Sequence, residues 1–275
     1  MGENPERADL WLARESENPD ITVVGLPWAD LSPGRARVPL EVRDRLRRFS
    51  TYHGERETDF SGLAATDAGN WPVTGLGLSD LVDYLKDRVP KIEGGLWIFL
   101  GGEDPVAEAL VESLPAETVG VIRFTVRPPA GDSLLADRDV ALIGVQGFAA
   151  SAKEHESARH SGTSSISNRQ MEKEGMRMTV DRALGKLAMS EAIHVSVDLD
   201  VLDQVYVPGA PDALPGGLTV RQLSDAVRRC GANVKVRSMD FIGADADLDS
   251  TQTLDVLCHL LLSAVAGYAE RALSP

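Results

Sequence analysis

Short runs of apolar residues alternate along the chain with segments whose apolar positions recur at helical spacing. Buried strands are predicted for the runs at residues 21–26, 96–100, 118–124, 139–145, 193–198 and 234–242. Helices are predicted at residues 39–49, 79–89, 105–113, 171–189, 219–230 and 251–273. Uniformly apolar strands that alternate with helices are typical of parallel sheets covered on both faces. The pattern therefore predicts an α/β fold, a three-layer αβα sandwich with a mostly parallel central sheet.

Local signals sharpen this pattern at several helix starts. Thr219 and Gln222 have the spacing of a capping box, in which the two side chains bind free backbone N–H groups. Pro39 and Pro105 suit the first turn of a helix, where a missing N–H costs nothing. Residues 161–167 are rich in serine, and we expect a loop too short to separate domains. A single domain over residues 1–275 is the prediction.

The charge and the cysteine content narrow the range of partners. The chain has 42 acidic and 28 basic residues and a net charge of −14. Such a charge repels nucleic acid and anionic membranes, and we expect neither as a partner. Two cysteines make no disulfide framework, and no signal peptide or transmembrane segment is predicted. These features indicate a cytoplasmic protein, while 43% hydrophobic residues allow a sizeable core.

Two aspartates mark the carboxyl end of the strand predicted at residues 193–198. Asp198 and Asp200 are two positions apart, which places both carboxylates on one side, roughly 6.5 Å apart along the backbone. Parallel sheets bind their ligands at the carboxyl ends of strands, and two like charges there normally need a cation. An Asp-x-Asp pair alone is a weak signal. The Pro/Gly-rich loop that follows, which ends in Gly-Gly-Leu-Thr, makes it more specific.

The stretch from Ser196 to Thr219 resembles the signature of the ureohydrolase (arginase/agmatinase) family. It reads Ser-x-Asp-x-Asp-x-x-Asp, then Pro-Gly, then Pro-Gly-Gly-Leu-Thr, without a gap in spacing. Members of this family hydrolyse guanidino compounds at a dinuclear manganese or nickel site, which this aspartate pair and two other motifs build. The resemblance covers most of the chain and implies the arginase-like fold.

The two other metal-binding motifs of the family differ in this chain. Where the family has Gly-Gly-Asp-His-Ser, residues 101–105 read Gly-Gly-Glu-Asp-Pro, so Asp104 takes the position of a histidine ligand. Where the family has Asp-Ala-His-x-Asp, the three ligand positions hold Thr125, Arg127 and Pro129. Proline offers no side-chain ligand, and a permanently charged guanidinium repels a metal. Of the ligand positions, only Asp198 and Asp200 keep the residues of the family.

Two further expectations follow from these replacements. Gly243 stands where the family has a substrate-contacting glutamate, so that contact is expected to be missing. The guanidinium of Arg127 is expected to lie between Asp198 and Asp200 as the counter-ion that replaces the metal. At roughly 4 Å and an effective dielectric constant near 20, such a contact is worth about 4 kcal/mol before desolvation.

The resemblance and the lost ligands together imply a non-catalytic subunit of a hetero-oligomeric ureohydrolase that hydrolyses a guanidino or biguanide compound. The implied partner is a paralogous, metal-bearing subunit in a trimer- or hexamer-based assembly. Nickel or manganese is expected in that partner, while no cofactor, catalytic residue or substrate-binding residue is expected in this chain.

Two alternatives remain open at this point. Glu103, Asp104, Asp198 and Asp200 could hold one magnesium or calcium ion and make the chain an enzyme for a guanidino compound in its own right. The position of Arg127 disfavours that interpretation. A regulatory or ligand-binding protein that uses the old pocket is the other alternative, and it rests on the fold alone.

Overall fold

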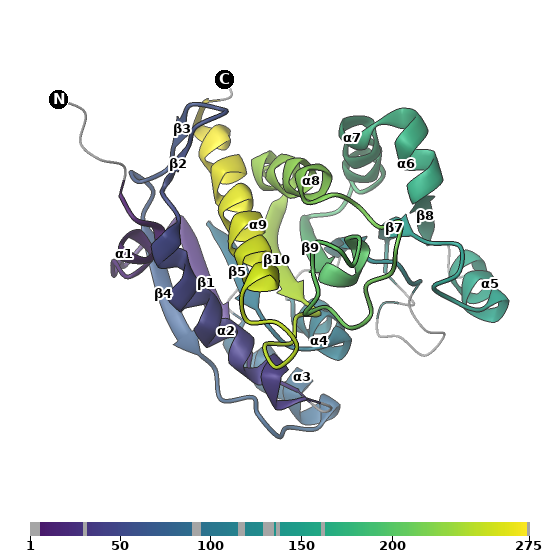
Figure 1. Cartoon of the computed structure of the whole chain (residues 1–275), viewed down its shortest axis with the longest axis horizontal. Helices are drawn as coiled ribbons and strands as arrows, with labels where there is room; N and C mark the ends of the chain where they lie inside the picture. The colour runs from purple at the N-terminus through teal and green to yellow at the C-terminus, as the bar shows by residue number, and fades with distance from the viewer. Residues whose placement is uncertain are drawn as a thin grey trace.

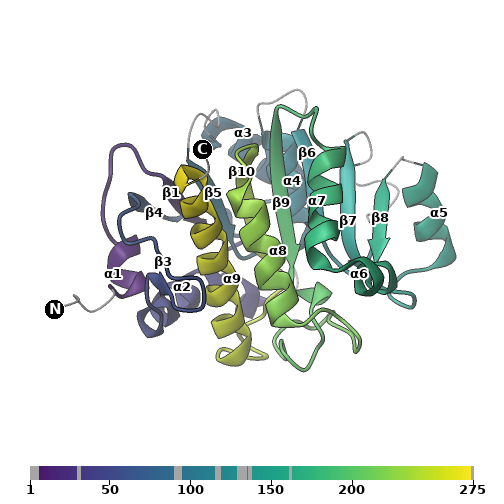
Figure 2. The same ribbon diagram turned by 90° about the horizontal axis from the view of Figure 1, so that it is seen from above.

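One sheet forms the centre of the molecule. The computed structural model describes residues 6–29, 32–89, 95–114, 119–128, 135, 138–160 and 163–273. Within these ranges, eight strands pair in the order β4-β1-β5-β10-β9-β6-β7-β8, and every neighbouring pair is parallel (Figure 2). The strands are β1 (Ile21–Gly25), β4 (Ala65–Asn70), β5 (Leu96–Leu100), β6 (Val119–Phe124), β7 (Val140–Val145), β8 (Ser164–Ser167), β9 (Ala192–Asp198) and β10 (Val236–Ile242).

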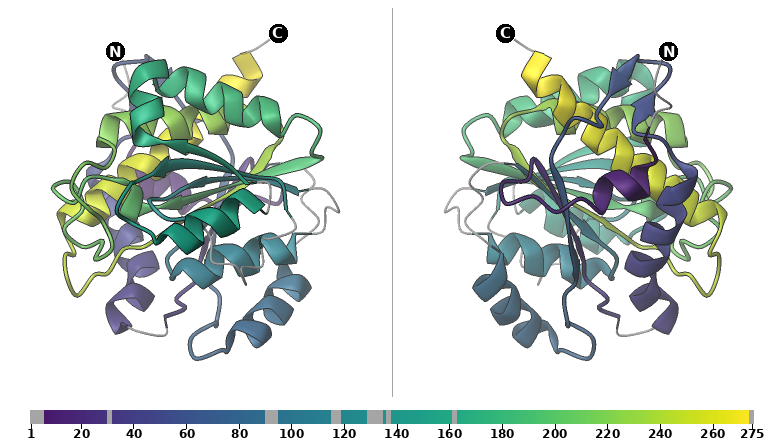
Figure 3. Two further views of the ribbon diagram at one scale, coloured as in Figure 1. Left: turned by 90° about the vertical axis from the view of Figure 1, so that its right-hand side faces the viewer. Right: turned by 90° about the vertical axis from the view of Figure 1, so that its left-hand side faces the viewer.

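Helices cover both faces of this sheet and complete three layers (Figures 1 and 3). One face carries α2 (Pro33–Arg45), α7 (Met176–Lys186), α8 (Val220–Ala232) and α9 (Gln252–Ala269), and the other carries α3 (Leu78–Arg88) and α4 (Asp104–Ser113). Shorter elements are α1 (Ala8–Leu12), α5 (Ala152–His160), α6 (Asn168–Glu174), the 3₁₀ turns η1 (Leu46–Arg48), η2 (Leu199–Val201) and η3 (Glu270–Leu273), and a hairpin of β2 (Tyr52–His53) and β3 (Thr58–Asp59). The predicted αβα sandwich is confirmed, whereas the single domain over residues 1–275 stays a prediction.

The strands β1, β5, β6, β7, β9 and β10 lie within two residues of their predicted bounds, because each is a mostly apolar segment whose residues are nearly all buried. The capping box at the start of α8 is also present. The Thr219 hydroxyl accepts a hydrogen bond from the Gln222 N–H, and the Gln222 side chain accepts one from the Thr219 N–H.

Two helix predictions were wrong, one in its bounds and one in its continuity. Helix α2 begins at Pro33, where the Ser32 side chain accepts a hydrogen bond from the Gly34 N–H, so Pro39 lies inside the helix and not in its first turn. The single helix predicted at residues 171–189 is two helices, because Gly175 adopts a φ of 79° between α6 and α7.

The loop predicted at residues 161–167 is also wrong in part. Residues 164–167 form β8, which pairs with β7 in parallel at the end of the sheet. Ile166 is the one apolar residue of this strand, and its side chain is buried. The serine-rich sequence has few of the residues that favour a strand. The strand forms because its backbone pairs with the otherwise open edge of β7.

Helix α9 crosses the middle of one helical layer. Among the described residues it is the one helix that is long and apolar enough to cross a membrane, but 67% of its 18 residues are buried inside the protein. That burial is the pattern of a core helix. Its packing against α8 and α2 explains the apolar character.

A carboxylate at the start of α9 gives a test of how the helix is anchored. Burial would raise the pKa of Asp249, but hydrogen bonds from the N–H and hydroxyl groups of Thr251 and Thr253 outweigh it and lower the pKa to about 2. The ionised form therefore stabilises the fold above pH 3.8, and this stability is lost as pH falls through about 2. Because solvent screens the site, Asp249→Asn is expected to lower the free energy of unfolding at pH 7 by about 1 kcal/mol.

Urea unfolding across this pH range measures the effect, and the difference between wild type and Asp249→Asn should shrink below pH 3.8. The control is Asp44→Asn, which removes an exposed carboxylate whose partner is Arg47. Equal losses for the two variants at pH 7 would contradict the special role of Asp249.

Candidate functional site at the carboxyl edge of the sheet

The parallel register brings four strand ends to the same edge. Leu100 of β5 is paired with Phe241 of β10, and Asp198 of β9 is paired with Ile242 of β10. Strand β6 ends beside β9 at Phe124. The residues that directly follow β5, β6, β9 and β10 therefore share one edge, which is where the sequence predicted the site.

Asp198 and Asp200 are both buried at this edge, with exposed fractions of 9% and 4%. The Asp198 Oδ1 atom accepts a hydrogen bond of 3.0 Å from the Asp200 N–H. The Asp200 carboxylate accepts bonds from the Val126 N–H at 3.2 Å and from the Thr125 hydroxyl at 3.3 Å. Thr125 stands at a metal-ligand position of the motif, but here its hydroxyl donates a hydrogen bond to Asp200.

Burial dominates the electrostatics of this pair. It raises the pKa of Asp198, and it raises the pKa of Asp200 well above its ordinary value, to which the negative charge of Asp198 also contributes. The Asp200 N–H and the charge of Arg123 lower the pKa of Asp198 in part, and Arg123 acts on Asp200 in the same direction. The pair thus depends on nearby donors and on a buried cation.

The expected role of Arg127 as counter-ion is wrong. Its side chain is 45% exposed, its Nε donates to the Ala149 carbonyl at 3.1 Å, and its guanidinium forms an ion pair of 3.4 Å with Asp212. Its charge is only a minor influence on the pKa of Asp200. At the rim the guanidinium keeps its contact with water, whereas a position between the aspartates would require full desolvation.

The buried cation of the site is Arg123, the last residue but one of β6. Its side chain is 2% exposed and forms ion pairs with Asp104 and, at 3.9 Å, with Glu108. Within the described part of the chain, its Nε and Nη1 atoms have no hydrogen-bond partner. The sequence did contain a signal for it, because an arginine inside the strand Val-Gly-Val-Ile-Arg-Phe requires a buried partner.

The remaining predicted positions are placed as follows. Asp104 is the first residue of α4 and faces Arg123, and the side chain of Glu103 lies 3.7 Å from that of Arg35. Pro129 lies outside the described residues. Among the residues that the structure describes, no group of three or more His, Cys, Asp or Glu side chains is arranged to hold a metal ion.

Gly243 closes the site behind Asp198. Its φ is +87°, in the region that side chains rarely adopt, and a Cβ atom there would lie 2.2 Å from the Asp198 Oδ1 atom. The present backbone therefore has no room for a glutamate at this position.

A buried hydrogen-bond network lies behind the aspartates. The His194 ring contacts the Ser238 hydroxyl and the Asp240 carboxylate, each at 2.7 Å, and the Ser196 hydroxyl donates to Asp240 at 3.0 Å. All four side chains are buried. This network joins β9 to β10 and fixes the strand that carries Asp198.

The loop that follows the aspartate pair is held by its own motif residues. Asp203 accepts hydrogen bonds from the Val205 N–H at 3.0 Å and the Gly216 N–H at 2.7 Å, and they lower its pKa. A Cβ atom at Gly217 would lie 2.3 Å from the backbone of Leu202, so only glycine allows this close approach. These motif residues have structural roles that require no metal.

Comparison with known proteins identifies the family. The model of the arginase family matches residues 123–267, which include Arg123, the aspartate pair and the loop. This chain belongs to the arginase family. It is 26% identical to a formimidoylglutamase of Halalkalibacterium halodurans over 277 aligned residues, which cover 89% of the chain and 86% of that protein. It is 24% identical to a guanidinopropionase of Pseudomonas aeruginosa, with 89% and 87% covered.

Solved structures of the arginase family share the fold. The formimidoylglutamase of Bacillus subtilis has a TM-score of 0.86 at 19% identity, with 100% of this chain and 95% of that chain covered. A formiminoglutamase of Trypanosoma cruzi, solved with manganese, has a TM-score of 0.85 at 20% identity, with 97% and 99% covered.

A pair of arginine variants tests which guanidinium stabilises the edge. Arg123→Met removes the ion-pair partner of Asp104 and Glu108 and the buried positive charge that acts on Asp198 and Asp200, and it is expected to lower the free energy of unfolding by about 3 kcal/mol. Arg127→Met removes an exposed ion pair and is expected to cost less than about 1 kcal/mol. Urea unfolding at pH 7 measures both, and a larger loss for Arg127→Met would overturn this assignment.

Proposed function

We propose that this chain is a non-catalytic subunit of a hetero-oligomeric ureohydrolase that hydrolyses a guanidino or biguanide compound. Such a complex would resemble metformin hydrolase, a nickel-dependent enzyme of this family in which one of two related subunits lacks the metal ligands. The observation that carries the proposal is the environment of Asp198 and Asp200, which contains two hydrogen-bond donors and the charge of Arg123.

The chemistry of the donor set supports this proposal. Hydrolysis in this family requires a hydroxide at neutral pH, and divalent metal ions lower the pKa of water enough to form it. Two such ions need about six nitrogen and oxygen ligands. The present residues do not fit that requirement, because Thr125 donates to Asp200, Arg127 carries a positive charge and Asp104 pairs with Arg123.

The substrate side of the edge supports the same proposal. A glutamate at the position of Gly243 would collide with Asp198 unless the backbone changed. Restoring the metal ligands of the family would therefore not be enough, because the substrate contact of the glutamate would still be missing. The preserved sheet and loop are consistent with a fold retained for assembly.

The partner that we propose is a paralogous subunit that carries manganese or nickel, in a trimer- or hexamer-based complex. Relatives of this chain include a formimidoylglutamase and a guanidinopropionase, and their names support a substrate of the amidine or guanidine class for the proposed complex. A chain with the family fold could occupy a subunit position in such a complex and stabilise the metal-bearing neighbour.

The test uses the isolated chain and the complex. We expect the purified chain, after dialysis against manganese or nickel, to hold far less than one ion per chain by elemental analysis. We expect a metal-bearing paralogue to become soluble and active when it is co-expressed with this chain. Stoichiometric metal together with turnover of a guanidino compound by the isolated chain would contradict the proposal, as would a fully active partner that never binds this chain.

Matched aspartate variants separate the two subunits. Asp198→Asn in this chain is expected to leave kcat of the complex within about twofold of wild type, because no reacting group contacts it. The same change at the corresponding aspartate of the partner should abolish turnover, because it removes a metal ligand. A large loss of kcat from Asp198→Asn in an intact complex would assign the chemistry to this chain.

A further inference from the structure

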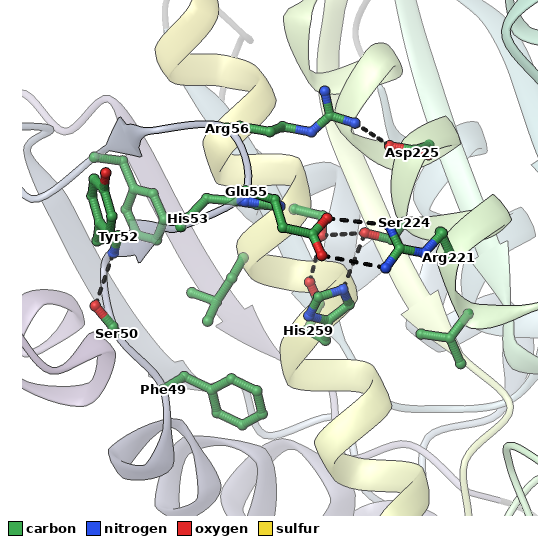
Figure 4. Close-up of a pocket in the computed structure, with 15 residues that line it drawn as sticks. Phe49, Ser50, Tyr52, His53, Glu55, Arg56, Arg221, Ser224, Asp225 and His259 are labelled. Atoms are coloured by element: carbon green, nitrogen blue, oxygen red, sulfur yellow. Dashed lines mark hydrogen bonds and ion pairs between the residues drawn. The ribbon is translucent and has the colours of Figure 1, made fainter.

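A cavity lies on the outer side of α8 and α9, beneath the β2–β3 hairpin (Figure 4). Its volume is about 540 Å³, within the range of roughly 300–1,000 Å³ that is usual for small-molecule sites. Phe49, Phe60, Val220 and Leu262 supply apolar wall, and none of the metal-ligand positions of the family lines it. The cavity is therefore separate from the site at the sheet edge.

The charged residues around this cavity neutralise one another. Glu55 of the hairpin accepts hydrogen bonds of 3.1 and 3.3 Å from Arg221 of α8, and Arg56 of the hairpin pairs with Asp225 of α8 (Figure 4). These four residues are all the Asp, Glu, Lys and Arg side chains of the lining. Because each has an opposite charge as its partner, the cavity favours an uncharged ligand over an ion.

The uncharged polar residues of the lining are Ser50, Tyr52, His53, Ser224, His259 and Ser263, and hydrogen bonds define the protonation of the His259 ring. The Ser263 hydroxyl donates its proton to the His259 carbonyl at 2.7 Å, so in its contact of 2.8 Å with Ser224 it must accept. The Ser224 hydroxyl therefore donates its hydrogen bond to Ser263. Ser224 must then accept in its contact of 3.2 Å with Nε2 of His259, so Nε2 is the donor. Nδ1 is consequently the nitrogen without a proton.

The other properties of this histidine agree with a neutral acceptor. His259 is partly exposed, but the buried part of its ring lowers its pKa; His53 and Arg221 add to the shift and Glu55 opposes it, and the net effect favours the uncharged ring at neutral pH. In Figure 4 one ring nitrogen faces Ser224 and the other is turned away from it. Among the described residues, Nδ1 has no hydrogen-bond partner. A cavity with an apolar wall and an acceptor that has no protein partner is a pattern of ligand-binding sites.

We propose that this cavity binds an uncharged aromatic or heteroaromatic molecule that donates a hydrogen bond to Nδ1 of His259. The rings of Phe49 and Phe60 provide the apolar contact, and the histidine selects for the donor. The pairs Glu55–Arg221 and Arg56–Asp225 that hold the β2–β3 hairpin are solvent-exposed, and such pairs contribute about 0.2–1 kcal/mol each.

The experiment compares indole with benzofuran, which has the same shape but an oxygen in place of the N–H group. Calorimetry or chemical-shift titration with the full chain is expected to give saturable indole binding, about three- to tenfold tighter than benzofuran binding, as one neutral hydrogen bond predicts. Indole should also shift the ring signals of His259. No saturable binding, equal affinities, or shifts confined to other residues would overturn the proposal.

Histidine variants provide the matched control. His259→Phe keeps a ring of similar size without the acceptor, and the preference for indole over benzofuran should disappear. His155→Phe makes the same change in α5, outside the cavity, and should keep the preference. Loss of the preference in both variants would contradict a specific bond to His259. If His259→Phe fails to fold, the comparison of the two ligands with the wild-type chain still decides.

Discussion

Two buried carboxylates at the carboxyl edge of the sheet set the conditions that the surrounding structure must meet. Asp198 and Asp200 lie where strand ends converge, and burial of two like charges is costly without compensation. The structure compensates in two ways. Backbone and hydroxyl donors bind the carboxylate oxygens, and Arg123 brings a positive charge from the neighbouring strand. The position of Asp104 beside Arg123 extends this charge balance to α4.

The persistence of the family signature in this chain has a physical explanation that does not involve catalysis. Asp203 binds two N–H groups of the loop, Gly217 allows contact with the backbone of Leu202, and Thr219 caps α8. Each of these residues would cost stability if replaced, whether or not a metal were bound. The motif is therefore stronger evidence for the fold than for the activity, and the ligand positions outside it carry the information about chemistry.

The sequence predicted the parts of the fold that depend on apolar runs, and it predicted that Asp198 and Asp200 lie at a strand end. It did not predict β8, because this strand is stabilised by its pairing with the edge of β7 and not by its own sequence. It also misplaced the start of α2, because the helix begins at Pro33, after the cap residue Ser32, and not at Pro39. The prediction that Arg127 is the counter-ion failed for a related reason. A motif gives positions along the chain, whereas burial and the direction of a side chain depend on the helices that pack above the strand.

A counter-ion that belongs to the chain changes how folding depends on the environment. When metal ions compensate buried carboxylates, the free energy of metal binding becomes part of the free energy of folding, and the protein loses stability when the metal is removed. Arg123 is part of the sequence and is always present, at the cost of its own desolvation, which its ion pairs offset in part. The edge of the sheet is thus stabilised before any partner or metal is encountered. This independence from a metal is what the proposed role as a non-catalytic subunit would require, because such a chain must fold before it meets a metal-bearing partner.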